Sequence, residues 1–257
     1  MIKLNLDQKE IKIETNQTSY LTQLVFWNSP LSFEYTPIFI ELSKRISCFW
    51  DIGANIGYYS LIASSVNPEV EVVAFEPAPE PLHFLKKNVE LNSLNIQVSS
   101  LALSDKEGEI VFYEVKNKKY TYLKYNLAGE GNTGSLTEGR NFSKTLVETT
   151  TIDKFHEGFK KPIDLIKIDT EGTEHLILAN ASKVINQFKP IIICETLFNK
   201  IEKDLEKVML GFGYEFYNHS GAGLKKVDSI IRNVDDGILN CFFVHPQKKN
   251  LIQDFII

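Results

Sequence analysis

Short apolar segments alternate with longer helical segments from residue 46 onward, and this alternation limits the fold more than any other feature of the chain. The apolar segments predict strands at residues 46–52, 71–75, 96–101, 163–169 and 191–195. The segments around them predict helices at residues 58–65, 79–92, 173–187 and 199–210. Strands and helices that alternate at this spacing form right-handed βαβ units around a parallel sheet. We therefore predict a doubly wound α/β fold.

The segments outside this alternation predict additions to the fold. Residues 1–40 predict an N-terminal cap of short strands and turns, in front of a main domain at residues 41–257, and a helix is predicted at 34–46. Residues 109–151 predict an inserted β-hairpin with a long polar loop between its strands, and a loop of that length is usually functional or disordered. Two closing strands are predicted at 214–217 and 241–244, with a loop between them.

The strongest local motif follows the first predicted strand and reads Asp51-Ile-Gly53-Ala54-Asn55-Ile-Gly57. Its glycines allow a tight turn and the close approach of a ligand to the backbone. The next helix begins there and offers free N–H groups and the positive end of its dipole. The third glycine of the dinucleotide motif is missing, and Asp51 suits a ligand with a positive charge. S-adenosylmethionine carries an ammonium and a sulfonium, so the motif favours this cofactor over NAD.

Two further segments extend the predicted cofactor site. Glu76, followed by Pro77, ends the strand at 71–75, and a carboxylate there can accept hydrogen bonds from both ribose hydroxyls. The third strand leads into residues 101–105, where an adenine ring would lie. Ala102 could flank the ring and Ser104 could reach its amino group, and an ordinary loop is the alternative interpretation.

A third motif, Lys167-Ile-Asp169-Thr-Glu171, ends the strand at 163–169. A buried lysine is costly unless it is paired, so we predict a carboxylate partner for Lys167, with Asp169 or Glu195 as the candidates. Ligands of such folds bind outside the carboxyl ends of the strands, where Asp169 and Glu171 lie. These carboxylates could act as a base, bind an ammonium or hold a metal. Ammonium binding and lysine pairing account for them without a metal, so none is predicted.

His219 opens the loop after the strand at 214–217. We expect that strand to run parallel to the core strands, which places the loop on the ligand side. A neutral imidazole can take a hydroxyl proton near neutral pH, and an ordinary loop histidine is the alternative. The candidates for the base are Asp169, Glu171 and His219, in that order.

Charge and composition exclude several classes of partner. The formal net charge of −5 supplies no broad positive field for a nucleic-acid backbone, so no nucleic-acid partner is expected. Neither a signal peptide nor the roughly 20 apolar residues of a membrane span is found, and we expect a soluble cytoplasmic protein. Cys48, Cys194 and Cys241 lie in apolar segments and are predicted to be buried free thiols. The sequence gives no indication of oligomeric state.

Several stretches between residues 48 and 196 resemble, in this order, the FkbM family of methyltransferases. They are FWDIGANIGYYSL, VVAFEPAPEPLHFLKKNVELN, LALSDKEGEI, GNTGSL, IDLIKIDTEGTEHLIL and KPIIICE. The resemblance implies a class I, Rossmann-like methyltransferase fold with a mostly parallel seven-stranded sheet and an inserted hairpin. It also implies methylation of oxygen by S-adenosyl-L-methionine, with S-adenosyl-L-homocysteine as the product. By this likeness Asp51, Gly53, Asn55 and Gly57 would hold the methionine end of the cofactor and Glu76 its ribose. Asp169 and Glu171 would face the methyl group.

The expected function is therefore S-adenosylmethionine-dependent O-methylation of a sugar, nucleotide-sugar or glycan hydroxyl. Aromatic and polar residues in the insertion would suit a sugar face; they are Tyr120, Tyr122, Tyr125 and Asn132. A polyketide or lipid hydroxyl is the alternative acceptor. Two alternatives come from other classes, an NAD-dependent oxidoreductase and a noncatalytic cofactor-binding or scaffold protein.

Overall fold

The computed structural model describes residues 1–6, 9–16, 19, 23, 31, 33–115, 142–221 and 223–257. It describes the backbone but not the side chains of residues 113–115, 142 and 143. The four residues of the insertion that were predicted to suit a sugar, Tyr120, Tyr122, Tyr125 and Asn132, lie outside the described residues.

The central sheet has five parallel strands in its core. These are β3 (Cys48–Ile52), β4 (Glu71–Phe75), β5 (Ile96–Ser99), β9 (Leu165–Ile168) and β10 (Ile191–Glu195). Three more strands follow at one edge: β11 (Glu215–His219), β12 (Leu224–Val227) and β13 (Asn240–Val244). Among the described residues the strand order is β12-β11-β13-β10-β9-β3-β4-β5. The doubly wound, mostly parallel α/β fold is therefore confirmed.

The edge of the sheet differs from the expectation in one strand. β13 pairs antiparallel with both β10 and β11, so β11 runs parallel to the core as predicted. β12 adds an eighth strand to the expected seven, through an antiparallel hairpin with β11. It lies within the segment that was predicted as a loop, because Leu224 is its single buried residue and its other side chains are polar or partly exposed.

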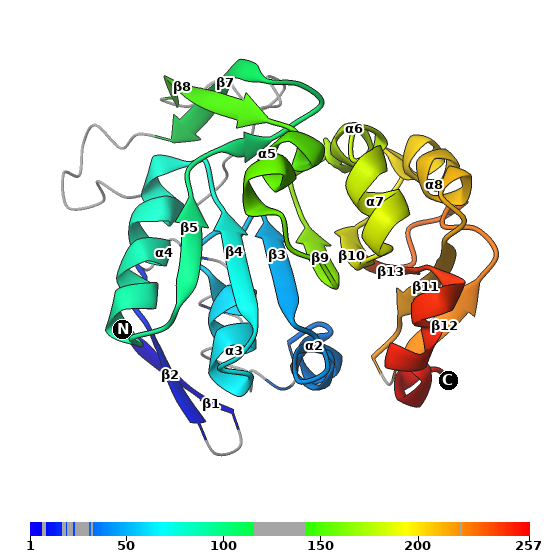
Figure 1. The fold of residues 1–257 in the computed structure, drawn as a ribbon, viewed down its shortest axis with the longest axis horizontal. Coiled ribbons are helices and arrows are strands. Elements are labelled where there is room, and N and C mark those ends of the chain that lie inside the picture. Colours follow the sequence, from blue (N-terminus) through cyan, green and yellow to red (C-terminus); the bar gives the residue numbers. More distant parts are fainter. Residues whose placement is uncertain are drawn as a thin grey trace.

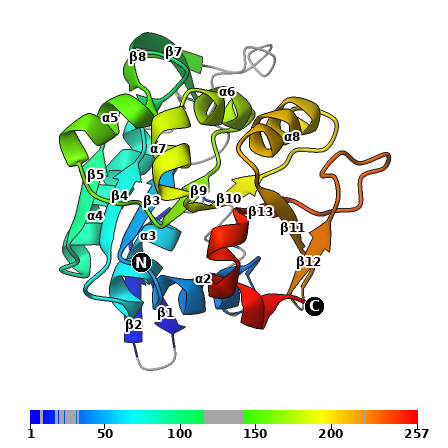
Figure 2. The ribbon, with the colours of Figure 1, turned by 45° about the vertical axis from the view of Figure 1, so that its right-hand side comes forward.

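Helices cover both faces of the sheet. One face carries α2 (Thr36–Ser43), α3 (Tyr58–Val66) and α4 (Pro79–Leu91). The other carries α5 (Ile152–Phe159), α6 (Glu174–Ala179), α7 (Ser182–Phe188) and α8 (Glu202–Gly211). Figure 2 shows the strands between these two groups of helices. The core strands read as continuous apolar runs because alternate residues enter the two clusters, as Phe49 and Trp50 of β3 do. Two short 3-10 helices follow β13, at Pro246–Leu251 and Gln253–Phe255.

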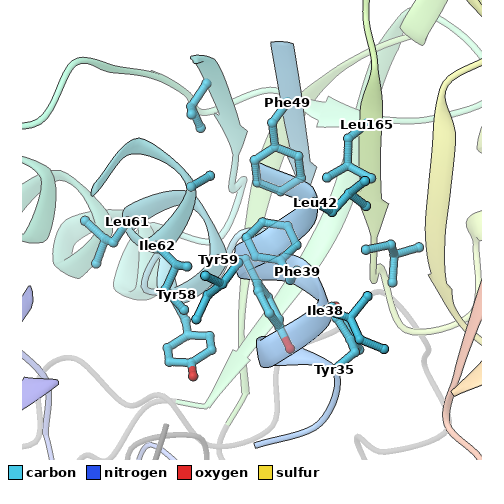
Figure 3. Packing of buried hydrophobic residues seen from close by; sticks show 14 of the residues in the cluster. Tyr35, Ile38, Phe39, Leu42, Phe49, Tyr58, Tyr59, Leu61, Ile62 and Leu165 are labelled. Atoms are coloured by element: carbon cyan, nitrogen blue, oxygen red, sulfur yellow. The ribbon is translucent and has the colours of Figure 1, made fainter. Parts of the chain in front are cut away.

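The packing of α2 determines where the N-terminal segment meets the sheet. Phe39 of α2 lies between Tyr59 of α3 and Phe49 of β3, with ring centroids 4.8 and 5.1 Å away (Figure 3). Tyr35, the N-cap residue of α2, stacks on Tyr59 at 4.8 Å. These contacts fix the turn before α2 close to the start of α3.

The helix predicted at 173–187 is divided into α6 and α7. Its continuation fails because the Asn180 side chain donates to the Leu176 carbonyl and because Asn180 and Ala181 leave helical geometry. The Asp153 carboxylate then accepts from the backbone N–H groups of Lys183 and Val184 and so caps the new helix start. α5 was missed by the sequence analysis. It begins directly after the hairpin strand, at a Thr151 cap that accepts from the Lys154 N–H.

The N-terminal strands β1 (Ile2–Leu6) and β2 (Lys9–Ile13) form an antiparallel hairpin. Its buried side chains, Leu4, Leu6, Ile11 and Ile13, belong to the cluster that contains α3 and α4. Asn88 of α4 accepts from the Glu14 N–H, and Asn92, the C-cap residue of α4, accepts from the Lys12 N–H of β2. The domain boundary at residue 40 stays a prediction, and α2 runs across it.

The insertion forms a separate small sheet. Among the described residues β6 (Ala102–Leu103), β7 (Gly108–Val115) and β8 (Phe142–Thr150) lie in the order β6-β8-β7. β7 and β8 pair antiparallel from Gly108 with Thr149 to Val115 with Phe142, which confirms the inserted hairpin. Figure 1 shows this hairpin beyond the upper ends of β4 and β5, which are their carboxyl ends. None of the helices in the described ranges combines the length and apolar character needed to cross a membrane.

Candidate active site

A cavity of about 620 Å³ lies outside the carboxyl ends of β3, β4 and β9. This is the edge of a doubly wound sheet at which such folds bind ligands, and the volume suits a small organic molecule. The turns that follow all three strands line it, and β6, β7 and the residues around Glu34 complete the wall. Nine of the residues predicted from the sequence line this cavity: Gly53, Ala54, Asn55, Glu76, Pro77, Ala102, Ser104, Asp169 and Glu171.

The turn after β3 is compressed between neighbouring strands. Gly53 has a φ of +73°, and a Cβ atom there would lie 1.9 Å from the carbonyl oxygen of Asp169. The backbone N–H groups of Gly53 and Ala54 both donate to the Phe75 carbonyl at 3.0 Å. Only glycine fits this combination of a left-handed backbone and a neighbouring carbonyl. The turn is therefore bonded to the end of β4 and in contact with the end of β9.

Asp51 is a buried carboxylate whose two oxygens have different environments. Its side chain is 1% exposed, and Oδ2 accepts from the Ser60 hydroxyl at 2.6 Å. Oδ1 has no hydrogen-bond partner among the described residues. Burial raises the pKa of Asp51, against the opposing effects of Lys167 and Ser60. Asp51 does not itself line the cavity, and the Lys167 ammonium lies 3.7 Å from Oδ1.

Lys167 has the carboxylate partner that the sequence predicted. Its Nζ lies 3.4 Å from Oδ2 of Asp169 and donates to the Gly53 carbonyl at 3.0 Å. A second carboxylate, Asp51, lies 3.7 Å away because β3 and β9 pair in parallel with Asp51 opposite Lys167. No contact of Lys167 with Glu195 is found within the described ranges. Burial alone would lower the pKa of Lys167, but the two carboxylates raise it above the usual range and keep it charged.

Glu76 is held by backbone donors at the end of β4. Its Oε2 accepts from the Asn55 N–H at 2.7 Å and its Oε1 from the Ala78 N–H at 2.9 Å. The side chain is 6% exposed, and burial raises its pKa to about 7 although both backbone donors act in the opposite direction. Each oxygen keeps lone pairs for further donors, so this carboxylate fits the two ribose hydroxyls of a nucleoside.

Residues 101–106 form the wall beside Glu76. Ala102 belongs to β6, and Ser104 donates its N–H to the Thr150 carbonyl at 2.8 Å and its hydroxyl to Asp105 at 3.1 Å. The segment is thus joined to β8 of the insertion rather than being an isolated loop. Pro77, Leu101 and Ala102 supply apolar surface at this end of the cavity.

The loop after β9 presents Glu171 to the cavity. Glu171 has a φ of +60°, and burial raises its pKa, with further contributions from Asp169 and Glu174. Glu174 itself is fully buried and accepts from the N–H groups of Thr170 and Gly172. Glu174 therefore fixes the loop conformation that positions Glu171.

Glu195 and His219 do not line the cavity. Burial raises the pKa of Glu195 to about 8, together with the charges of Asp169, Glu171 and Glu174. His219 lies at the end of β11 within the β11–β12 hairpin, and burial lowers its pKa. Its ring lies 6.3 Å from that of Tyr35, which stacks on Tyr59 at the cavity wall. In the described ranges no group of three or more His, Cys, Asp or Glu side chains is arranged to hold a metal ion.

Sequence reasoning missed a group of residues at the other end of the cavity. Phe33, Glu34, Tyr58 and Tyr59 line it there. Tyr59 donates its hydroxyl to Oε2 of Glu34 at 3.0 Å. No local motif marks Glu34, because its approach to the cavity depends on the packing of α2 against α3.

Residues 51–216 match the methyltransferase FkbM domain. The matched range begins at Asp51 and includes Glu76, Asp169 and Glu171. The chain belongs to the FkbM methyltransferase family. Curated relatives include the methyltransferase sdnD of Sordaria araneosa, 29% identical over 57% of this chain and 64% of its own length. The 31-O-demethyl-FK506 methyltransferase FkbM of Streptomyces tacrolimicus is 41% identical over 25% of each chain. This FkbM-family chain thus spans less than two thirds of the length of either relative.

A solved structure agrees with the family assignment at the level of the fold. The crystal structure of methyltransferase FkbM from Methylobacillus flagellatus KT is similar, with a TM-score of 0.50 at 16% identity, over 77% of this chain and 43% of that chain. The class I methyltransferase fold is therefore shared, and the predicted family is confirmed.

Proposed function

We propose that the protein is an S-adenosylmethionine-dependent O-methyltransferase that acts on a sugar hydroxyl. The observation that carries this proposal is the pair of carboxylates around the turn after β3: Glu76 lies at the cavity wall, and the buried Asp51 has an Oδ1 without a hydrogen bond among the described residues. A ligand that fits both places needs a donor with positive charge and a pair of hydroxyls. S-adenosylmethionine carries both.

Three groups of residues would bind the methionine end, the ribose and the adenine of the cofactor. Gly53 and Asn55 of the cavity wall would hold its methionine end, with Asp169 as a partner of the ammonium. Asp51 and Gly57 belong to the same turn but do not line the cavity, so they would support this end from behind. Glu76 would accept from the ribose hydroxyls. Pro77, Ala102 and Ser104 would surround the adenine. Ala54 lies at the cavity wall between Gly53 and Asn55 in the chain.

When bound, S-adenosylmethionine supplies an activated methyl group on a sulfonium. The protein must hold the acceptor oxygen in place and receive its proton. Glu171 is suited to receive it because its pKa is raised and it faces the cavity. Asp169 is less suited to that task, because the Lys167 ammonium already lies 3.4 Å from its Oδ2. His219 is the third candidate and would need to reach the cavity past Tyr35 and Tyr59.

The acceptor class is supported by the polar and aromatic character of the cavity end around Glu34. Sugars present hydroxyls for carboxylates and apolar ring faces for aromatic side chains. The name of the Streptomyces relative places its methyl group on an oxygen, which supports an oxygen acceptor here. A polyketide or lipid hydroxyl is the alternative.

Affinity for S-adenosylmethionine should rise about tenfold between pH 6 and pH 8. The ribose hydroxyls donate to the ionised form of Glu76, and the Glu76 pKa of about 7 leaves this form in the minority at pH 6. Isothermal titration across this range checks the prediction. Glu76→Gln should bind more weakly and show a much smaller pH dependence. An affinity that is the same at both pH values in the wild type would contradict the role of Glu76.

Glu171→Gln should lower kcat by about 100-fold or more, because a positioned general base contributes on that order. Its affinity for S-adenosylmethionine should change less than about threefold. Asp169→Asn should instead weaken cofactor binding, because it removes a charge opposite the ammonium. Turnover is measured as S-adenosylhomocysteine release with simple methyl glycosides as acceptors. Glu148→Gln, an exposed carboxylate on β8, is the matched control. Wild-type turnover in both site variants would refute the carboxylate assignment.

A noncatalytic cofactor-binding or scaffold protein is the rival function. Parallel titrations with S-adenosylmethionine, S-adenosylhomocysteine and NAD separate the possibilities. Binding of the first two and not of NAD is the expected result. Binding of NAD alone would exclude the proposed function, and cofactor binding without methyl transfer to any acceptor would favour the rival.

A further inference from the structure

Glu34 is a carboxylate at the acceptor end of the cavity that the cofactor does not require. It lies in the turn before α2, with a φ of +42°. Glu34 lines the cavity and part of its surface is exposed to solvent. The protein atoms around its carboxyl group nevertheless shield it from water, and this burial raises its pKa. A non-glycine residue persists in the left-handed region only where its surroundings fix it, and such positions cluster at functional sites.

A hydrogen bond fixes the Glu34 carboxylate in place. The Tyr59 hydroxyl donates to Oε2 at 3.0 Å, and Asn240 lies near enough to the side chain to lower its pKa. Asn240 opens β13, whose antiparallel direction brings its first residue to the edge where the core strands end. A carboxylate offers about four lone-pair positions and Tyr59 occupies one of them, so at least two remain for a ligand in the cavity. Two neighbouring hydroxyls of one sugar match that number.

The charges at this end of the cavity have a negative excess. In the described part of the wall, Glu34, Asp169 and Glu171 line the cavity together with one nearby lysine, Lys167. Lys167 is already engaged by Asp169 and Asp51, at 3.4 and 3.7 Å. Among the described residues of the cavity wall, the other cation is Lys106, which belongs to the segment that follows Ser104 at the opposite end. A phosphate group placed beside Glu34 would therefore meet like charges without a free cation of the described wall nearby.

The aromatic rings beside Glu34 supply the apolar part of the same surface. Phe33, Tyr58 and Tyr59 line the cavity next to it, and Phe33 packs edge-on against Tyr58 at 5.4 Å. A fixed carboxylate beside ring faces suits a molecule with hydroxyls at its edge and an apolar face, which describes an uncharged sugar.

We propose that Glu34 binds the acceptor, accepting hydrogen bonds from two neighbouring hydroxyls of a neutral sugar and excluding acceptors that carry phosphate. This assignment rests on the proposed methyl transfer to a sugar hydroxyl and narrows its acceptor to glycosides and glycans without phosphate. Glu34 is a specificity-determining residue here, whereas the proton goes to Glu171.

The test compares wild type with Glu34→Gln on matched acceptors. The probes are the methyl α-glycosides of glucose, galactose and mannose, and the corresponding α-hexose 1-phosphates, which leave the same ring hydroxyls free. For the neutral glycosides KM should rise about 10- to 100-fold in Glu34→Gln, the cost of charge-assisted hydrogen bonds. The kcat should change less than about threefold, because the base is untouched. The ratio of kcat/KM for a glycoside to kcat/KM for the matching phosphate should be more than about 100 in the wild type and about tenfold smaller in the variant.

Controls separate this role from a structural one. Glu41→Gln changes an exposed carboxylate on α2, paired with Lys44, and should keep wild-type KM and preference. Tyr59→Phe removes the donor to Glu34 and should raise the glycoside KM in the same direction, which keeps the assignment testable if Glu34→Gln does not fold. Glycoside affinity for the protein saturated with S-adenosylhomocysteine gives a readout that needs no turnover.

The possible failures are distinguishable. A wild type that methylates glycosides while Glu34→Gln and Tyr59→Phe keep its KM and its preference would refute the role of Glu34 and leave the proposed function standing. A wild type that binds S-adenosylmethionine but methylates no probe would refute the sugar acceptor itself. Equal use of glycosides and phosphates by the wild type would refute the exclusion of phosphate.

Discussion

Replacing Gly53 with alanine should destabilise the protein by more than about 4 kcal/mol and abolish cofactor binding, the largest effect expected of any single substitution here. The new Cβ atom would lie 1.9 Å from the Asp169 carbonyl oxygen, a backbone atom that no side-chain rotation can move. The ends of β3 and β9 would have to separate, and Asp51, Lys167 and Asp169 would separate with them. Chemical denaturation and titration with S-adenosylmethionine measure both effects.

Gly237→Ala is the matched control for this substitution. Gly237 has nearly the same φ, +74°, but a Cβ atom there would meet nothing within 4 Å. The substitution should therefore lower the free energy of unfolding only by the strain of a left-handed alanine, about 1–2 kcal/mol, and leave cofactor binding intact. Equal destabilisation by the two alanines would show that backbone strain, rather than the contact with Asp169, explains the glycine at position 53.

Lys167→Met should destabilise the protein by about 3–5 kcal/mol, because removing one partner leaves a buried charge uncompensated. Asp51 would keep its 1% exposure and lose its cation, and the Gly53 carbonyl would lose its donor. The Asp51 pKa, already raised by burial, would rise further in the folded state. A carboxyl group whose pKa is higher in the folded protein than in the unfolded chain stabilises the folded protein at low pH. This stabilisation is lost as the pH rises through the folded-state pKa. The loss of stability of Lys167→Met relative to the wild type should therefore be larger at pH 8 than at pH 5.

Lys161→Met supplies the comparison for this effect. Lys161 pairs with Glu71 at 2.8 Å, but its side chain is 59% exposed. Its loss should change stability by less than about 1 kcal/mol, as for other surface ion pairs. A Lys167→Met variant as stable as Lys161→Met at both pH values would mean that Asp51 is neutral in the native protein.

Sequence patterns predicted those parts of the site that depend on one strand and the turn after it. Three segments of the site come at or directly after the end of a strand of the parallel core. They are the turn from Asp51 to Gly57, Glu76, and the loop with Asp169 and Glu171. Parallel strands end at one edge of the sheet, so residues that follow them meet there whatever the details of packing. The lysine inside β9 likewise predicted a carboxylate partner from the cost of burial alone.

Features that depend on contacts between distant segments were missed or incomplete. The pairing of Lys167 with Asp51 requires β3 and β9 to be neighbours in one register, which the spacing of neither motif contains. The division of α6 from α7 depends on Asp153, which reaches the start of α7 from α5. β12 joins the sheet only because β11 offers it an edge.

By itself the sequence determined the fold class, the family and the strand ends that carry the cofactor residues, because these follow from local periodicity and from the direction of parallel strands. The tertiary structure alone placed Glu34 beside Tyr59 and left His219 outside the cavity wall. Both outcomes depend on how α2 packs against α3 and how β11 turns into β12. Packing of that kind joins residues far apart in the chain, so no motif within a single segment records it.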